Sequence, residues 1–114
     1  MLKEPGVFSE LITGLPEADI PFEGVRGWIS QGPRVQTVFF EIEAIGEIPA
    51  HSHGAQWGVV VEGEMELTIE GESRACQKGD HYFIPGNAVH SAVFHKKTWV
   101  IDVFEDQDRY AEKT

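Results

Sequence analysis

Three histidines and one glutamine occupy positions from which their side chains can act as metal ligands. His51 and His53 are separated by one residue, Gln56 follows, and His90 comes after the turn at 85–87. Residues i and i+2 of a β-strand project from the same face, so a strand here would direct both imidazoles to one side. Neutral imidazole is the commonest metal ligand, and an amide oxygen can add a fourth. These residues could together hold a divalent metal, whereas a His-x-His pair alone is more often two surface histidines in a loop.

Two charged residues near the C-terminus are candidates for catalysis. Asp102 shares a strand face with Val100 and Phe104, and an acid among apolar neighbours is costly to bury unless it is paired or used. If that face lines an interior, Asp102 is suited to proton transfer; otherwise it is a strand-end residue that faces solvent. Arg109 follows in the tail. It can hold a substrate carboxylate through two hydrogen bonds, or it can pair with one of the many surface acids.

Short strands separated by turns must position these residues. Residues 35–44 and 64–70 alternate apolar and polar side chains with period two, which is typical of strands with one buried face. Further strands are expected at 25–31, 58–61, 73–76, 81–84, 89–95 and 98–104. We expect a turn or an edge strand at 7–12 and room for a short helix at 106–114. Many short strands at close spacing predict an all-β sandwich or barrel.

Length and composition narrow the classes of function. The 114 residues correspond to one domain, 1–114, and 19 acidic against 9 basic residues give a net charge of −10. This charge disfavours nucleic acids and anionic membranes as partners. Cys76 is the single cysteine, so no intrachain disulfide forms and a reducing, cytoplasmic setting is expected. Residues 1–6 contain no apolar stretch typical of a signal peptide, and no run approaches the ~20 apolar residues of a membrane helix.

Two motifs in order resemble the paired motifs of the cupin superfamily. The first reads Gly46-x4-His51-x-His53-x2-Gln56-x6-Gly63, and the second reads Gly79-x5-Pro85-x-Asn87-x2-His90. The resemblance covers about residues 35–104. Gln56 stands where the family has glutamate, Asn87 replaces a glycine, and Phe94 takes the place of a frequent asparagine. Asn87 is compatible with the motif because asparagine also adopts left-handed backbone conformations.

The resemblance implies a fold and a ligand set. Cupins are small double-stranded jelly-roll barrels that hold a divalent metal inside, so the core barrel is expected at about 25–104, with flanking terminal segments. Carried onto this chain, the ligands are His51, His53, Gln56 and His90. Imidazole and amide donors suit Fe, Co, Ni, Zn or Mn without choosing among them. Because these four ligands are neutral, the metal's charge is left to attract a small anionic substrate or ligand.

Several functions follow from the resemblance. The stretch from Asp102 to Phe104 with Arg109 is similar to a stretch of small pectin-degradation cupins that linearise unsaturated uronates. This implies metal-assisted isomerase or lyase chemistry on a small carboxylated sugar or organic acid, with Asp102 and Arg109 as catalytic residues. The alternatives are a non-catalytic sensor barrel, a non-haem iron dioxygenase and a metal-free sugar-nucleotide epimerase-like barrel. A homodimer is expected, with the apolar segments Val7-Phe8 and Leu11-Ile12 buried against a second subunit.

Overall fold

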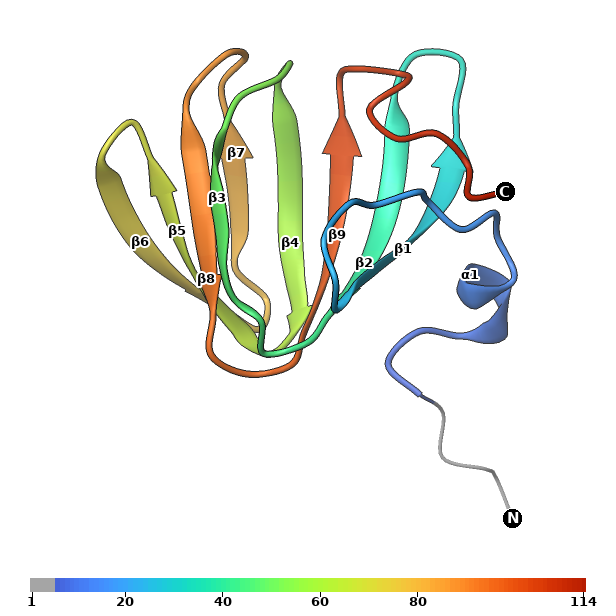
Figure 1. Cartoon of the computed structure of the whole chain (residues 1–114), viewed down its shortest axis with the longest axis horizontal. Coiled ribbons are helices and arrows are strands. Elements are labelled where there is room, and N and C mark those ends of the chain that lie inside the picture. The colour runs from blue at the N-terminus through green and yellow to red at the C-terminus, as the bar shows by residue number, and fades with distance from the viewer. Residues whose placement is uncertain (1–5) are drawn as a thin grey trace.

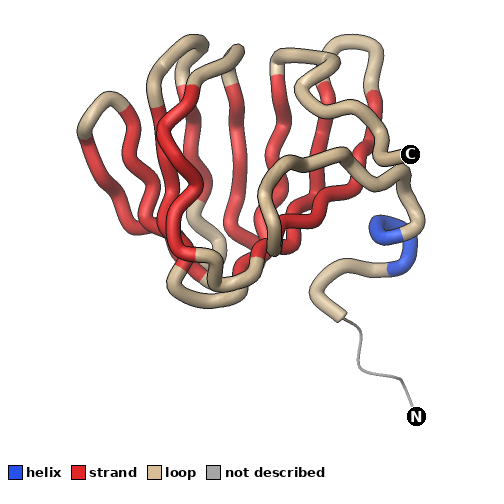
Figure 2. Tube along the Cα trace, in the orientation of Figure 1, coloured by secondary structure: helices blue, strands red, loops and turns tan. Residues whose placement is uncertain are grey.

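Nine β-strands and one helical turn make up the regular structure of the computed structural model, which describes residues 6–114 (Figures 1 and 2). In chain order the elements are α1 (Glu10–Thr13), β1 (Val25–Gln31), β2 (Gln36–Ile42), β3 (Gly46–His51), β4 (Gln56–Glu62), β5 (Glu64–Ile69), β6 (Glu72–Gln77), β7 (His81–Ile84), β8 (His90–Phe94) and β9 (Thr98–Phe104). Residues 1–5, which hold most of the segment judged not to be a signal peptide, lie outside the described residues. Across residues 6–114, no helix is both long enough and apolar enough to traverse a membrane.

The strands form two antiparallel sheets that face each other. The larger sheet has the order β1-β2-β9-β4-β7, and the smaller one has the order β3-β8-β5-β6. In Figure 1, β3 and β8 lie beside β4 and β7, and the sheets splay apart toward β6 and β1. The all-β barrel predicted from the strand spacing is confirmed.

An apolar interior fills the space between the sheets because the strands alternate as their sequences predict. Along β2 and β9 every second side chain is buried, including Val38, Phe40, Val100 and Phe104. On β5, Met65 and Leu67 face the same interior while Glu64 and Glu66 face solvent. Burial of these side chains at roughly 25 cal/mol per Å² of apolar area is the main force that holds the two sheets together.

A turn or an edge strand was expected at residues 7–12. The edge strand is wrong, because the chain forms the short helix α1 there. The Ser9 hydroxyl caps it by accepting a hydrogen bond from the backbone N–H of Leu11 at 3.0 Å. Gly14 ends it, and its N–H donates to the carbonyl of Glu10 at 2.9 Å. These caps give backbone groups of the segment hydrogen-bond partners within the segment itself. In an edge strand the same groups would need partners on a neighbouring strand.

The short helix considered for the tail 106–114 does not form. The tail's backbone is instead bonded to distant segments: Asp19 N–H donates to the carbonyl of Ala111 at 2.8 Å, and Lys113 N–H donates to the carbonyl of Glu17 at 2.7 Å. An isolated bridge also joins Ala18 to Glu112. These long-range bonds use the groups that a helix would have paired internally, and they draw the tail back across the barrel.

Candidate metal centre

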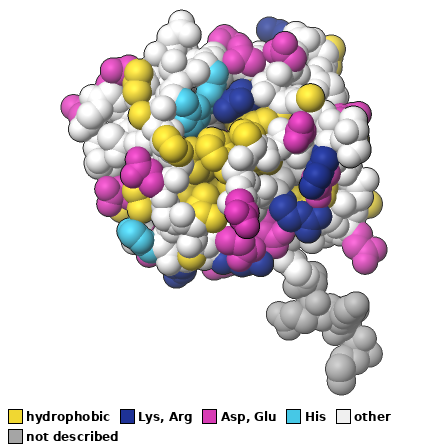
Figure 3. All heavy atoms as spheres, in the orientation of Figure 1, with side chains coloured by type: hydrophobic (Ala, Val, Ile, Leu, Met, Phe, Trp, Pro, Cys, Tyr) yellow, Lys and Arg dark blue, Asp and Glu magenta, His cyan; other side chains and the backbone are white. Residues whose placement is uncertain are grey.

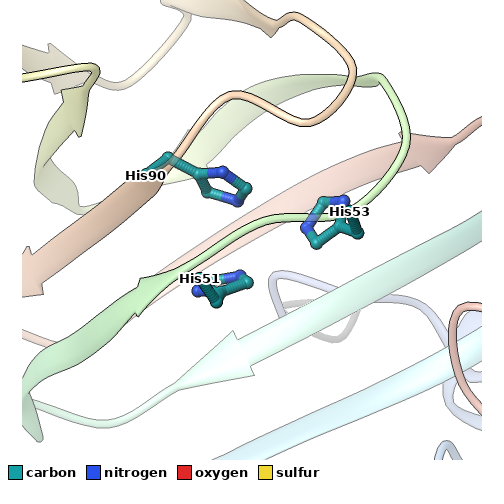
Figure 4. A group of neighbouring side chains, drawn as sticks. All are labelled: His51, His53 and His90. Carbon is teal, nitrogen blue, oxygen red and sulfur yellow. The ribbon is translucent and has the colours of Figure 1, made fainter.

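Three histidine rings converge at one end of the barrel (Figure 4). His51 is the last residue of β3 and pairs across the sheet with His90, the first residue of β8. His53 lies in the loop after β3, so the expectation that one strand face carries both His51 and His53 is wrong. The β3 ladder is irregular between Ile48 and His51, and the chain leaves the sheet directly afterwards. The loop nevertheless returns His53, and one ring nitrogen from each histidine lies within 4.8 Å of the others.

Backbone carbonyls fix the same tautomer in all three rings. The Nδ1 atoms of His51, His53 and His90 lie 2.9 Å from the carbonyl oxygens of Pro49, Gly54 and Ala88 respectively. A carbonyl oxygen only accepts, so each Nδ1 carries the proton and donates it. The Nε2 lone pair of each ring is then available to a metal, which is how metal-binding histidines are commonly oriented.

His53 and His90 are also held in the neutral form that a metal requires. Burial lowers the pKa of His53 to about 4, with a smaller contribution from the positive charge of Arg109. Burial likewise lowers the pKa of His90. Both rings are therefore unprotonated at neutral pH, and a metal ion need not displace protons from them.

Gln56 opens β4 and points into the same cavity, where it is 8% exposed. Hydrogen bonding from its side chain helps to lower the pKa of Asp102. The amide oxygen Oε1 is buried and has no hydrogen-bond partner among the described residues. A buried carbonyl oxygen without a donor is costly, and a cation in the cavity would satisfy it. The three Nε2 atoms and this oxygen form a donor set that fits a divalent transition metal.

Asp102 and Tyr82 form a buried pair beside the histidines. The Tyr82 hydroxyl donates to Asp102 Oδ1 at 2.6 Å. Gly58 lies between them on β4, paired with Tyr82 on one side and Asp102 on the other, and a Cβ there would collide with both. Burial raises the pKa of Asp102 to about 6, against the opposing effect of hydrogen bonds from Tyr82 and Gln56. The same burial raises the pKa of Tyr82 well above its usual value, so the phenol keeps its proton and remains a donor.

The C-terminal tail carries Arg109 over the cavity. Gln36 is 1% exposed and holds the tail through both ends of its amide. Its Nε2 donates to the carbonyl of Tyr110 at 2.9 Å, and its Oε1 accepts from Tyr110 N–H at 3.0 Å. The guanidinium of Arg109 then lies 4.3 Å from the centre of the Tyr110 ring, and its Nε is buried without a partner. Within residues 6–114, Arg109 makes no salt bridge, so the alternative of a surface ion pair is not what the structure shows.

A single cavity connects all of these groups. Its empty space, with the open solvent at its mouth included, amounts to about 640 Å³. It is lined by every residue predicted as a ligand or catalytic residue: His51, His53, Gln56, His90, Asp102 and Arg109. The structure thus brings the predicted site residues together, while their roles as ligands and catalysts stay predictions.

The sequence pattern of the Cupin domain family matches residues 38–103, which is more than half of the chain. The chain belongs to the cupin family. The predicted resemblance over about 35–104 is thereby confirmed. A search of curated proteins found no match.

Solved cupin structures resemble this barrel closely. KdgF from Halomonas sp. is 28% identical, with a TM-score of 0.69 over 76% of this chain and 83% of that one. An RmlC-like cupin from Shewanella frigidimarina is 25% identical, with a TM-score of 0.73 over 82% of this chain and 86% of that one. Salicylate 1,2-dioxygenase from Pseudoaminobacter salicylatoxidans has a TM-score of 0.71 over 77% of this chain and 26% of that one. At 16% identity, it supports the fold alone.

Two residues of the cupin site were missed in the sequence. Tyr82 lies in the strand predicted at 81–84 without a role assigned to it, although its alternation with Ile84 puts both side chains on the inner face. Gln36 opens a strand whose inner face is otherwise apolar, and a polar residue at a buried position was the available signal. Neither partner, Asp102 or Tyr110, is near in sequence, so the pairings themselves had no local signal.

Proposed function

We propose that this cupin is a metal-dependent enzyme that acts on a small carboxylated sugar or organic acid by isomerisation or lyase chemistry. The observation that carries the proposal is the convergence, in one cavity, of three histidines, an acid and an unpaired guanidinium. The sequence similarity to pectin-degradation cupins and the structural similarity to KdgF support a uronate or a related acid. A small anionic ligand, and no nucleic acid, is the partner that this site and the net charge of −10 favour.

His51, His53, His90 and Gln56 would hold the metal through three Nε2 atoms and Oε1. When bound, a divalent metal polarises a carbonyl or enediol oxygen and so eases removal of the neighbouring proton. Fe, Co, Ni, Zn and Mn all suit this donor set. Since none of the four ligands is charged, a carboxylate or enolate in the cavity would neutralise the ion.

Asp102 is the residue proposed to move the proton. Tyr82 donates to its Oδ1 at 2.6 Å and fixes the carboxylate's orientation. Its place beside Gln56 keeps it close to any molecule that reaches the metal ligands. A buried carboxylate held in one orientation is suited to general acid–base catalysis.

Arg109 is the residue proposed to bind the substrate's carboxylate. Its guanidinium lies over the cavity without an acidic partner among the described residues, and Gln36 holds its segment in place. A guanidinium binds a carboxylate through two parallel hydrogen bonds, so it would orient the acid relative to the metal and Asp102.

The first experiment is elemental mass spectrometry of protein purified without a histidine tag. We expect close to one equivalent of a transition metal, which is lost in His90→Ala and His51→Ala along with a lower melting temperature. His81→Ala is the matched control, because His81 is exposed and stacks on Trp57 rather than facing the cavity. Unchanged metal content in both ligand variants would refute the ligand assignment.

The metal's identity and a substrate screen separate the related functions. Zinc, nickel or manganese directs the assays to isomerisation or lyase reactions of uronates and keto acids, whereas iron directs them to oxygen chemistry. Absence of metal after incubation with a panel of divalent ions would contradict the proposal and favour a binding barrel without turnover. The cytoplasmic location expected from the single cysteine stays a prediction, which fractionation of cells can check.

A further inference from the structure

The cavity has two chemically different ends. The polar end lies where β3 and β9 finish and where β4 and β8 begin, because His51, Phe104, Gln56 and His90 occupy those strand termini. The other end lies where β2 and β8 finish and where β1 and β3 begin. Ile42 and Phe94 close their strands there, and Val25 opens β1 opposite Ile42. Along β8, four residue steps from His90 to Phe94 separate the two ends by about 13 Å.

Every polar side chain that lines the cavity belongs to the histidine end. Asp102, Gln56 and Arg109 lie among the histidines, and the remaining polar side chains are tied to them. Tyr82 is hydrogen-bonded to Asp102, Tyr110 adjoins Arg109 in the chain, and Ser91 adjoins His90. The groups that can bind a charged or oxygen-rich part of a ligand are therefore gathered in one region.

Below that region the lining becomes apolar at the next inward residue of each strand. On β8 the inward side chains run from His90 to Ala92 and then Phe94, and on β9 Val100 follows Asp102. Ile20 and Phe22, from the segment before β1, also line the cavity and are packed against the core. None of these side chains can form a hydrogen bond, and the strand backbones are already paired in the two sheets.

This division is visible on the surface of the molecule. Figure 3 shows an exposed hydrophobic patch bordered by histidine and by Lys or Arg atoms on one edge. Ala92 is the small residue between His90 and Phe94 on the inner face of β8, so a ligand held at the polar end adjoins apolar side chains.

We propose that the ligand is a 2-hydroxy or 2-oxo carboxylic acid that carries an aromatic or branched aliphatic group, and not a polyhydroxylated sugar acid. The inference rests on the proposed function and narrows its substrate class. The acid end would lie at Arg109 and the metal ligands, and the apolar group would lie against Val25, Ile42 and Phe94. At the apolar end, the extra hydroxyls of a sugar acid would lose their hydrogen bonds to water and find no hydrogen-bond partner in the protein.

The test compares acids that share one head group. The affinities of 3-phenyllactate, lactate and gluconate, all 2-hydroxy acids, are measured by calorimetry on the metal-loaded protein, with galacturonate as the uronate. Each buried methylene tightens binding roughly fourfold, so we expect 3-phenyllactate to bind at least tenfold more tightly than lactate. Gluconate and galacturonate should bind no more tightly than lactate. Binding of either sugar acid as tightly as 3-phenyllactate would overturn the inference.

A matched pair of variants locates the apolar group. Val25→Thr replaces a methyl group by a hydroxyl of similar size in the apolar end. It should weaken the binding of 3-phenyllactate at least threefold and leave the binding of lactate unchanged. Val89→Thr makes the same change at an exposed position outside the cavity and should alter neither affinity. Should Val25→Thr fail to fold, as judged by its melting curve, Ile48→Thr replaces it, because Ile48 also lines the cavity but is only partly buried. An equal loss of affinity for 3-phenyllactate and for lactate, or no loss of affinity for either, would contradict the assignment.

Metal content separates this inference from the proposed function. If the protein holds a metal through the histidines but prefers gluconate or galacturonate, the substrate class fails and the metal-dependent function stands. If no metal is bound and no acid shows measurable affinity, both fail. Retention of 3-phenyllactate preference in a protein that contains one equivalent of metal supports both.

Discussion

As a ligand, Gln56 would leave the proposed metal centre without a charged protein ligand. Its Oε1 is buried without a donor in the described structure, and its side chain helps to lower the pKa of Asp102. A glutamate at the same position would compensate part of a metal's charge and would repel Asp102. Because the amide is neutral, Asp102 can stay close to the metal ligands. A bound metal ion would also keep enough positive charge to attract an anion.

The exchange Gln56→Glu tests this balance. The added carboxylate should tighten binding of a divalent metal by about tenfold and weaken binding of an anionic ligand to the loaded site. Metal titration and anion calorimetry on the same preparation measure both effects. Gln77→Glu adds the same charge on the outside of β6, where the side chain is exposed, and should change neither. A Gln56→Glu protein with unchanged metal affinity would mean that residue 56 is not a ligand.

Asp102 makes the stability of the metal-free protein depend on pH. Its folded pKa of about 6 exceeds the ordinary value of 3.8, so between these values the folded state binds more protons than the unfolded state. This contribution to stability is lost as pH rises from about 4 to 7, by about 3 kcal/mol. His53 acts in the opposite direction, because its folded pKa of about 4 lies below 6.5.

Comparison with Asp102→Asn isolates the aspartate. Asparagine does not titrate and can still accept from Tyr82, whereas His53 is common to both proteins and its effect cancels. The free energy of unfolding of the variant, relative to wild type, should therefore rise by about 3 kcal/mol between pH 4 and pH 7 in the presence of a chelator. Urea unfolding at a series of pH values provides the measurement. A difference that stays constant with pH would show that Asp102 titrates normally.

Among the elements, β4 matters most to the site because a glycine in its middle makes room for a hydrogen bond that crosses it. Tyr82 on β7 and Asp102 on β9 are the cross-strand partners of Gly58, and their side chains meet above it. Glycine normally weakens a strand, and here its missing Cβ is what permits the contact.

Replacement of this glycine should be costly. In Gly58→Ala the new methyl would meet both Asp102 and Tyr82, so we expect a loss of about 3 kcal/mol of stability and a rearranged Asp102. Gly86→Ala is the control, since a Cβ there finds its nearest atom at 3.6 Å, an ordinary contact. Thermal unfolding of the two variants gives the comparison. Equal stability of both would show that β4 can shift to accommodate the methyl group.

At the scale of the whole molecule, the apolar residues expected to meet a second subunit are partly used within the chain. Phe8 packs edge-on against Trp28 and Phe39, at 6.4 and 5.8 Å between ring centres. The larger sheet nevertheless keeps an exposed apolar groove, with Trp57 42% and Phe83 59% exposed. Arg34 and Glu105 line the same groove and carry opposite charges. In a two-fold dimer, Arg34 of one protomer can face Glu105 of its partner, which suits a second copy of this chain.

A dimer through this groove is therefore the expected assembly. Sedimentation at micromolar concentration should show twice the chain mass of 12.7 kDa, and Phe83→Glu should convert it to the monomer. Val89→Glu, also exposed but outside the groove, should leave the dimer intact. Only 12.7 kDa species in the wild-type protein would rule the dimer out.

Period-two alternation let the sequence alone determine the all-β class and most strand positions, while the cupin motifs were identified by resemblance, from residue types at fixed spacings. Strands 25–31, 81–84 and 98–104 have the bounds that the pattern predicts, because burial on one face dictates the side chain at every second residue. Asn87 has the predicted left-handed conformation, with φ 65°. Strand β3 was not predicted, because it has no fully buried side chain and its alternation breaks at Ala50.

Tertiary structure decided everything that depends on contacts between distant segments. His53 reaches the other histidines from a loop, and its carbonyl accepts from Asn87 N–H at 2.7 Å, a bond that joins the two motifs. Arg109 comes to the cavity only because Gln36, 74 residues before Tyr110, holds the tail. Asp102 became an interior acid when a second sheet covered its face. Alternation reports which residues share a face, but what that face meets is set by the packing of the sheets and the return of the tail.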